Sequence, residues 1–290
     1  MRIAIWVTGH SIADTVAQHV MRGLRLCCQT PTLLHTDKAA LAGQFDLNIG
    51  YGILRGMQAV FRNSKSYIHL DKGYFQPGHF TGYYRISHNG TQQTNLSKVS
   101  SRDERLIKLG IKILPQRFTA ALEKILVCPP TPDVCGFFNI NQEKWINHSA
   151  IQYKDKIIIR HKDSSIPLAD HLAQARKVIT FNSSVGWQAL RQGIEVISDP
   201  NHSVIGAWHN KLDKESILDL DGRYKFFAKM ANLQMNLREI ESGFLWPLIQ
   251  NLISSSVLTA EKQSLPMSLS TPSNPAHDPK QTSNISSIES

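Results

Sequence analysis

The stretch of sequence that decides the fold is VITFNSSVGWQALRQGIEVISDP, residues 178–200. It begins with a β-rich run, passes through three polar residues, continues with apolar side chains at helical spacing, and ends on a second β-rich run. Gly193 follows the helical part, at the position where a left-handed cap is expected. A strand, a helix and a strand in this order predict a βαβ unit and hence a parallel sheet.

The polar residues between that strand and helix are Asn182, Ser183 and Ser184. The free N–H groups and the dipole of a helix N-terminus favour an anion, and the side chains add donors. One such residue could simply be the N-cap of the helix. Three in a row favour a phosphate or nucleotide, because open α/β sheets bind ligands at the carboxyl ends of their strands. Gly186, in the first helical turn, would let a ligand or a backbone approach closely.

Strands and helices alternate in the same way along most of the chain, which predicts an α/β fold. The predicted strands are Ile3–Val7, Asp46–Ile49, Tyr67–Leu70, Ile125–Cys128, Lys156–Arg160, Val178–Phe181 and Ile194–Ser198. The predicted helices are residues 11–26, Ile53–Phe61, Gln142–Ala150, Leu168–Arg176 and Val185–Gln192.

Two segments give other predictions. Residues 73–101 are polar and aromatic without helical period, and they predict loops or a hairpin. Apolar residues between Phe226 and Ile240 fall at helical spacing, with Gly243 as a stop signal, and predict one long helix that could pack across two domains. A domain boundary is expected near Leu114-Pro115.

A second group of potential ligand contacts is Arg160-His161-Lys162, which ends another predicted strand. In a parallel sheet this end lies on the same edge as Asn182–Ser184. An Arg side chain can fork onto phosphate oxygens, while Lys supplies a point charge. The residues therefore predict phosphate contacts, and the alternative is a solvated basic turn.

Candidates for acid–base chemistry lie in the first half. Asp71 follows a predicted strand and could act as general base for an acceptor hydroxyl. It could equally be a turn residue or pair with Lys72. His10 and Asp14, in the first loop and the following helix, are comparable candidates, and Asp14 alternatively complements a helix N-terminus.

Aromatic side chains near Asp71 are candidate acceptor contacts. Tyr74, together with Tyr83 or Tyr84, would offer a stacking surface for a sugar. With Lys72 they form the predicted acceptor side.

The 290 residues carry a formal net charge of +9, and the sequence pI is about 9.4. A basic surplus points to an anionic partner such as nucleic acid, a nucleotide or an acidic glycan, with a solvated basic surface as the alternative. Residues 257–290 are rich in Ser, Pro, Thr and Asn, lack aromatic residues and sum to −1. They predict a disordered tail, and the surplus belongs to the remainder of the chain.

Several classes of protein are disfavoured. No apolar run approaches the roughly 20 residues that span a bilayer, and the N-terminus lacks the pattern of a signal peptide. The cysteines form no C-x-x-C pair, so we expect a reducing cytoplasm and no structural zinc. There is no P-loop and no G-x-G-x-x-G after the first strand, which disfavours a dinucleotide oxidoreductase, and we expect no metal-dependent transfer. The cysteines are Cys27, Cys28, Cys128 and Cys135.

At this level of detail the sequence resembles the donor-binding half of GT-B-type glycosyltransferases. It is most similar to the capsule-polysaccharide-biosynthesis (Kdo-transferase-like) group and to phage-borne glycosyltransferases. The specific part is the Asn-Ser-Ser…Ala-Leu…Gly-Ile-x-Val run at 182–196, and where the capsule group has Arg-x-His-Pro this chain has Arg160-His161-Lys162-Asp163. Further matching pieces are Gly50–Gly52, His69–Phe75, Ser87–Gly90, Ile125–Pro130, Trp145, Ile157–Lys162, Ala169–Ala175, Val196–Asp199 and Arg223–Gly243.

The resemblance implies two Rossmann-like domains facing across a cleft. Their predicted bounds are 1–115 for the acceptor-side domain and 116–256 for the donor-binding domain with its closing helices, followed by the tail at 257–290. By this analogy Arg160 and Asn182–Ser184 contact the phosphate or nucleotide of the donor, with His161, Lys162 and Gly186 beside them.

The function expected from this reading is a metal-independent glycosyltransferase. It would take a nucleotide sugar as co-substrate, without a further cofactor, and act on a glycan or a modified DNA base. One alternative is a non-catalytic protein of the same fold that binds nucleic acid or a glycan. Another is a sugar-nucleotide epimerase.

Overall fold

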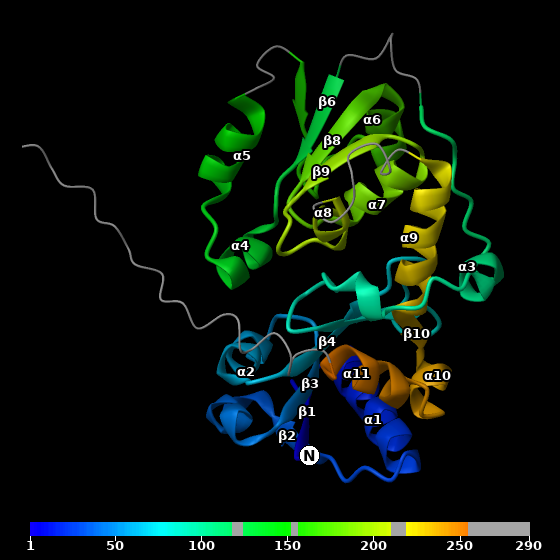
Figure 1. The fold of residues 1–290 in the computed structure, drawn as a ribbon. Coiled ribbons are helices and arrows are strands. Elements are labelled where there is room, and N and C mark those ends of the chain that lie inside the picture. Colours follow the sequence, from blue (N-terminus) through cyan, green and yellow to red (C-terminus); the bar gives the residue numbers. More distant parts are fainter. Residues whose placement is uncertain (118–123, 152–155, 210–218, 255–290) are drawn as a thin grey trace, which may run out of the picture. The chain divides into compact units, whose positions relative to one another are not determined.

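The computed structural model describes residues 1–117, 124–151, 156–209 and 219–254, and these fold around two β-sheets (Figure 1). The predicted tail at 257–290 lies outside the described residues. The first sheet has the strand order β10-β5-β4-β3-β1-β2 and the second the order β7-β6-β8-β9. The described parts of the chain make a mixed α/β fold with parallel sheets, as the sequence predicts. The strands are β1 (Ile3–Val7), β2 (Thr32–His35), β3 (Leu47–Tyr51), β4 (Tyr67–Lys72), β5 (Tyr83–His88), β6 (Lys124–Cys128), β7 (Ile157–Ile159), β8 (Ala175–Thr180), β9 (Glu195–Ser198) and β10 (Gln234–Asn236).

Helices connect most of these strands. The described helices are α1 (Ser11–Leu26), α2 (Met57–Asn63), α3 (Glu104–Lys108), α4 (Pro132–Phe138), α5 (Gln142–Ala150), α6 (Leu168–Gln174), α7 (Ser184–Arg191), α8 (Val204–His209), α9 (Leu220–Asn232), α10 (Leu237–Glu241) and α11 (Leu245–Ile253), with 3-10 segments at Thr36–Gln44 and Leu96–Lys98. None of the described helices combines the length and the apolar character needed to cross a bilayer.

The first sheet is buried on both faces. Alternate residues of a strand point to opposite sides, so the residues of β1 divide between two apolar clusters. In β1, Ile3 and Ile5 pack into the larger apolar core, to which α1 contributes Val16 and Val20. Ala4 and Trp6 pack on the other face, with Met57 and Phe61 of α2 among their neighbours. β1 to β4 pair in parallel, whereas β5 runs antiparallel to β4.

The second sheet is parallel throughout. Ile125 and Val127 of β6 pack on one face with Ile179, while Leu126 and Val178 join the larger core on the other. Contacts join α7 to β8 and β9, and α6 to β6. Every strand of this sheet therefore ends at the same edge.

Most of the predicted elements are confirmed with shifted ends, and Ile3–Val7 and Gln142–Ala150 match to the residue. Gly193 has a φ of +77°, as a left-handed cap requires. The strand at Thr32–His35 was not predicted. Within residues 73–101, Tyr83–His88 forms the antiparallel partner of β4, in line with a hairpin.

The single long helix predicted from Phe226 to Ile240 is wrong. Helix α9 ends at Asn232, and Gln234–Asn236 forms β10 before α10 begins. β10 adds to the first sheet by pairing antiparallel with β5. The helical spacing correctly predicts α9 and α10. The residues between these helices form backbone hydrogen bonds with β5 instead of continuing the helix.

After β10 the chain packs on the first sheet. Contacts join α10 and α11 to α1, beside which Figure 1 shows them. Gly23 of α1 makes this packing possible, because a Cβ atom there would overlap the carbonyl oxygen of Ile240. Met1–Ser255 thus forms one compact unit.

Gly193 and Gly52 allow a matched test of the cap that follows α7. Both residues have positive φ, but a methyl group at Gly193 would overlap the carbonyl oxygen of Pro115, whereas Gly52 has open space around its Cα. We expect Gly52→Ala to lower the free energy of unfolding by about 1–2 kcal/mol through backbone strain alone. Gly193→Ala should cost roughly 1–3 kcal/mol more, because the overlap adds to the strain. Urea unfolding followed by tryptophan fluorescence measures both, and equal losses would contradict the close approach to Pro115.

Candidate functional site

Polar side chains from three strand ends meet at the carboxyl edge of the second sheet. Arg160 follows β7, Asn182 follows β8, and Asp199 follows β9. The parallel register places these ends on one edge, where open α/β sheets bind ligands. The sequence analysis named the first two residues and missed the third.

The junction between β8 and α7 is partly occupied by structural hydrogen bonds. Ser183 is the N-cap of α7, and its Oγ accepts from the N–H of Val185 at 3.3 Å. Asn182 uses its carbonyl oxygen to accept from Gln92 Nε2 at 2.6 Å. Ser184, in contrast, is exposed. The N-cap alternative thus accounts for Ser183, and Ser184 is the exposed residue of the three.

Gln92 ties this junction to the first half of the chain. It is 2% exposed, and besides donating to the Asn182 carbonyl, its Oε1 accepts from the N–H of Val204 at 2.9 Å. Next to Gln92 in the chain, the Oγ1 of Thr91 accepts from Asn182 Nδ2 at 3.5 Å. One amide side chain therefore bridges the ends of two βα units. Sequence reasoning did not single out Gln92, because nothing local distinguishes it from a loop glutamine.

Gly186 serves packing within the second half. A Cβ atom there would lie 2.9 Å from Ile205 Cδ1 and 3.3 Å from Thr180 Cγ2. The close approach that the sequence predicted at this glycine is therefore made by apolar side chains.

The basic cluster divides into one anchored residue and two exposed ones. Arg160 donates from Nη1 to the carbonyl of His161 at 3.3 Å and from Nη2 to that of Ile166 at 3.5 Å, while its Nε is buried without a partner in the described chain. His161 and Lys162 are exposed. The guanidinium of Arg160 thus folds back over its own loop. Its two hydrogen bonds are long, at 3.3 and 3.5 Å, and a phosphate could replace them.

A further cluster at this edge, which the sequence analysis missed, joins Asp199 to His202. The two side chains are 2.8 Å apart, from Oδ1 to Nδ1. The His202 ring also lies against two phenylalanines, Phe138 of α4 and Phe181 at the end of β8. The spacing of Asp199 and His202 resembles an ordinary turn, so the sequence carried no signal for it.

In the first half, Asp71 at the end of β4 forms an ion pair with Arg85 of β5, from Oδ2 to Nη2 at 2.7 Å. Burial raises the pKa of Asp71, but the Arg85 guanidinium, His69 and the backbone N–H of Lys72 together hold the pKa below its usual value. Asp71 is therefore a carboxylate at neutral pH, and it pairs with Arg85 rather than with the Lys72 side chain.

Arg85 extends this pair toward the second sheet. Its Nε donates to the carbonyl of Thr91 at 3.1 Å, and its Nη1 to that of Lys72 at 3.2 Å. Since Thr91 precedes Gln92 in the chain, the hydrogen bonds of Arg85 and those of Gln92 together connect Asp71 to Asn182 through this covalent link.

The predicted acceptor-side residues have different surroundings. Tyr74 is 4% exposed, and its ring meets Trp187 of α7 edge-on at 5.2 Å, so a sugar cannot stack on it in this structure. Burial also raises the pKa of Tyr74 to about 12. Tyr84 is fully buried as well, whereas Lys72 is exposed and Tyr83 half-buried.

The remaining base candidates lie after β1. Asp14 accepts from the N–H of Thr8 at 2.9 Å, so its carboxylate fixes the loop between β1 and α1. His10 precedes α1 and is half-buried, and its ring forms no hydrogen bond within the described residues. The same ranges contain no group of three His, Cys, Asp or Glu side chains that could hold a metal ion.

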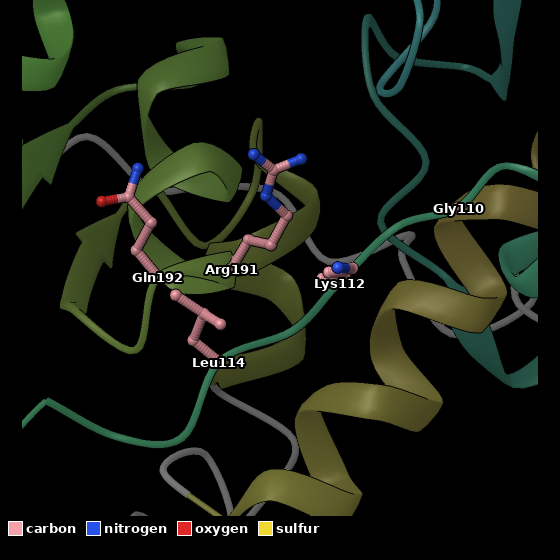
Figure 2. A pocket seen from close by; sticks show the side chains of 5 residues that line it. All are labelled: Gly110, Lys112, Leu114, Arg191 and Gln192. Carbon is pink, nitrogen blue, oxygen red and sulfur yellow. The ribbon is translucent and has the colours of Figure 1, made fainter.

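A cavity of about 350 Å³ lies away from these residues. Figure 2 shows it between the end of α7, with Arg191 and Gln192, and the segment from Gly110 to Leu114. Because Arg191 closes α7 and Ser184 opens it, the cavity lies at the opposite end of the helix from the candidate site.

No protein-family model matches the chain, and a comparison with curated proteins finds no match. Among solved structures, the chain is similar to the KpsC β-Kdo 2,7-transferase of Thermosulfurimonas dismutans, with 11% identity, a TM-score of 0.43, and coverage of 84% of this chain and 99% of that one. The KpsC β-Kdo 2,4-transferase of the same organism gives 12% identity and a TM-score of 0.39, over 68% of this chain and 80% of that one. Both TM-scores lie below 0.5, so neither similarity bears on what this chain does.

His69, in the middle of β4, should make stability depend on pH. Burial lowers the pKa of His69 to about 4, from 6.5 in an exposed site. The unfolded chain therefore binds the proton first, so this contribution is complete above pH 6.5 and is lost as the pH falls toward 4. Between pH 8 and pH 5 it amounts to about 2 kcal/mol of unfolding free energy. Urea unfolding at both pH values measures the loss, which should shrink by that amount in His69→Gln; an identical pH dependence in the variant would contradict the assignment.

Proposed function

We propose that this protein is a glycosyltransferase of GT-B-like organisation that moves a sugar from a nucleotide-sugar donor to a glycan or modified-DNA acceptor. The observation that carries the proposal is the convergence of Arg160, Ser184 and the Asp199–His202 pair on the carboxyl edge of one fully parallel sheet. The sequence run at 182–196, which resembles the donor-binding motif, begins at the same edge.

The donor phosphate would be held at this edge by charge and by backbone N–H groups. Ser184 is exposed in the first turn of α7, whose N-terminus favours negative charge, and its side chain carries a hydroxyl donor. His161 and Lys162 are exposed after β7, on the same edge but separated from β8 by β6, and Lys162 adds positive charge. Asn182 and Ser183 support the site by fixing the junction, because their polar groups are engaged by Gln92 and Val185.

The acceptor side is proposed for the carboxyl end of the first sheet, with His10 as the base. Three candidates follow from the sequence, but Asp71 is paired with Arg85 and Asp14 holds the Thr8 loop. The imidazole of His10 makes no hydrogen bond within the described residues, and an imidazole can accept the proton of an acceptor hydroxyl. Tyr83, at the start of β5, and Lys72, at the end of β4, are the proposed acceptor contacts.

A nucleotide panel tests the donor site. Binding to the folded state raises the melting temperature, so we expect at least one nucleoside diphosphate or monophosphate, or its sugar conjugate, to stabilise the full chain. Ser184→Ala should reduce this shift while leaving the ligand-free melting temperature unchanged. Ser183→Ala should instead lower the stability of the ligand-free chain by about 1 kcal/mol through loss of the N-cap.

A wild-type chain that no nucleotide stabilises would contradict the proposed function. Stabilisation that Ser184→Ala leaves intact would contradict only the placement of the donor. Binding of nucleic acid that falls steeply with salt, without any nucleotide effect, would favour a binding protein.

The base is tested by transfer or donor hydrolysis with the best nucleotide sugar from the panel. We expect His10→Gln to lower kcat by about 100-fold or more, since general base catalysis contributes 10²–10⁴-fold. KM for the donor and the melting temperature should stay near their wild-type values. Asp14→Asn serves as the control. It should lower the melting temperature, because Asp14 fixes the Thr8 loop, while the folded variant should keep a kcat near that of the wild type. Full activity of His10→Gln would return the role to Asp71.

A further inference from the structure

The Asp199–His202 pair contains more than its turn requires. Asp199 Oδ1 accepts from the backbone N–H groups of Asn201 at 2.9 Å and His202 at 2.8 Å, which completes the turn after β9. The third bond, to Nδ1 of the His202 ring, adds nothing to the backbone. The side-chain exposure of His202 is 39%, so the other end of the ring is open to solvent.

The His202 ring is held between two aromatic rings and a carboxylate. The ring centroid lies 5.3 Å from that of Phe181 in a stacked arrangement and 4.4 Å from that of Phe138 at a steep angle. Aromatic faces and a carboxylate are both groups against which a cationic ring can bind. Burial raises the pKa of Asp199, but the hydrogen bonds from the His202 side chain and from the backbone outweigh it and lower the pKa. Asp199 is therefore a carboxylate that can hold an imidazolium.

We propose that His202, held as an imidazolium by Asp199, Phe138 and Phe181, binds the phosphate of the donor nucleotide through Nε2. In this arrangement Nδ1–H donates to Asp199 and Nε2–H donates to a phosphate oxygen. This inference rests on the proposed function and names one of its binding residues.

A phosphate is the ligand class that fits this position. The pair follows β9, directly beside β8, whose end leads to Ser184. The guanidinium of Arg160, the other cation at the edge, already donates to two carbonyl groups of its own loop. His202 is thus the cation at this edge that is fixed in orientation and still has an open donor. As the sugar leaves, negative charge grows on the nucleotide phosphate, and a fixed donor stabilises that charge.

The test measures the affinity of the full chain for nucleoside diphosphates by calorimetry, with the four common bases, the matching nucleosides and inorganic phosphate as probes. We expect His202→Gln to raise the Kd of the best diphosphate about tenfold or more, as expected for loss of a charge-assisted hydrogen bond. His202→Phe, which keeps an aromatic ring in the cluster, should show the same loss. His148→Gln, an exposed histidine on α5, is the matched control and should bind as the wild type does.

Nuclear magnetic resonance of the wild-type chain, labelled at histidine, covers the case in which both His202 variants fail to fold. The ring nitrogens of His202 should shift with the diphosphate and not with the nucleoside. Unchanged affinity in folded variants, or no shift in the wild type, would overturn the role of His202 while leaving the proposed function in place. A wild-type chain that binds no nucleotide would overturn both.

Discussion

The parallel pairing of β6, β8 and β9 is the constraint on which the candidate site depends. A parallel strand must be followed by a crossover before the next strand begins, so each of these strands ends at the same edge and hands over to a turn or a helix there. The polar residues of three separate turns are brought together by this topology alone. An antiparallel neighbour would have sent Asp199 to the opposite edge, away from Ser184.

Many polar side chains between the first sheet and this edge form hydrogen bonds that hold the structure together. Asp71 and Arg85 neutralise each other, and Arg85 reaches Thr91, whose neighbour Gln92 then binds Asn182 and Val204. A buried polar group that lacks a partner costs free energy, so such a chain persists only because each member satisfies the next. Asp71, the obvious carboxylate of the first half, is consequently a linking residue in this structure.

Local signals predicted the local elements well. The helix at Gln142–Ala150 and the strand at Ile3–Val7 are fixed by nearby side chains, and Gly193 marks its own backbone conformation. The strand at Gln234–Asn236 could not be found in this way, because it exists only through pairing with β5, some 150 residues earlier in the sequence. The helical spacing around it is correct, and long-range pairing overrides it at a single point.

The site residues show the same division between local and long-range causes. Three consecutive polar residues after β8 suggested a ligand, yet the N-cap explains Ser183 and the Gln92 bridge explains Asn182, which leaves Ser184. Asp199 and His202 look like a turn in the sequence, and the turn does use the carboxylate. The turn does not require the His202 ring. Phe138 and Phe181, which lie outside the turn, contact this ring. Once caps and turns are accounted for, Ser184 and the imidazole of His202 remain at the ends of β8 and β9 without a structural role within the described residues, and both can donate to an anion.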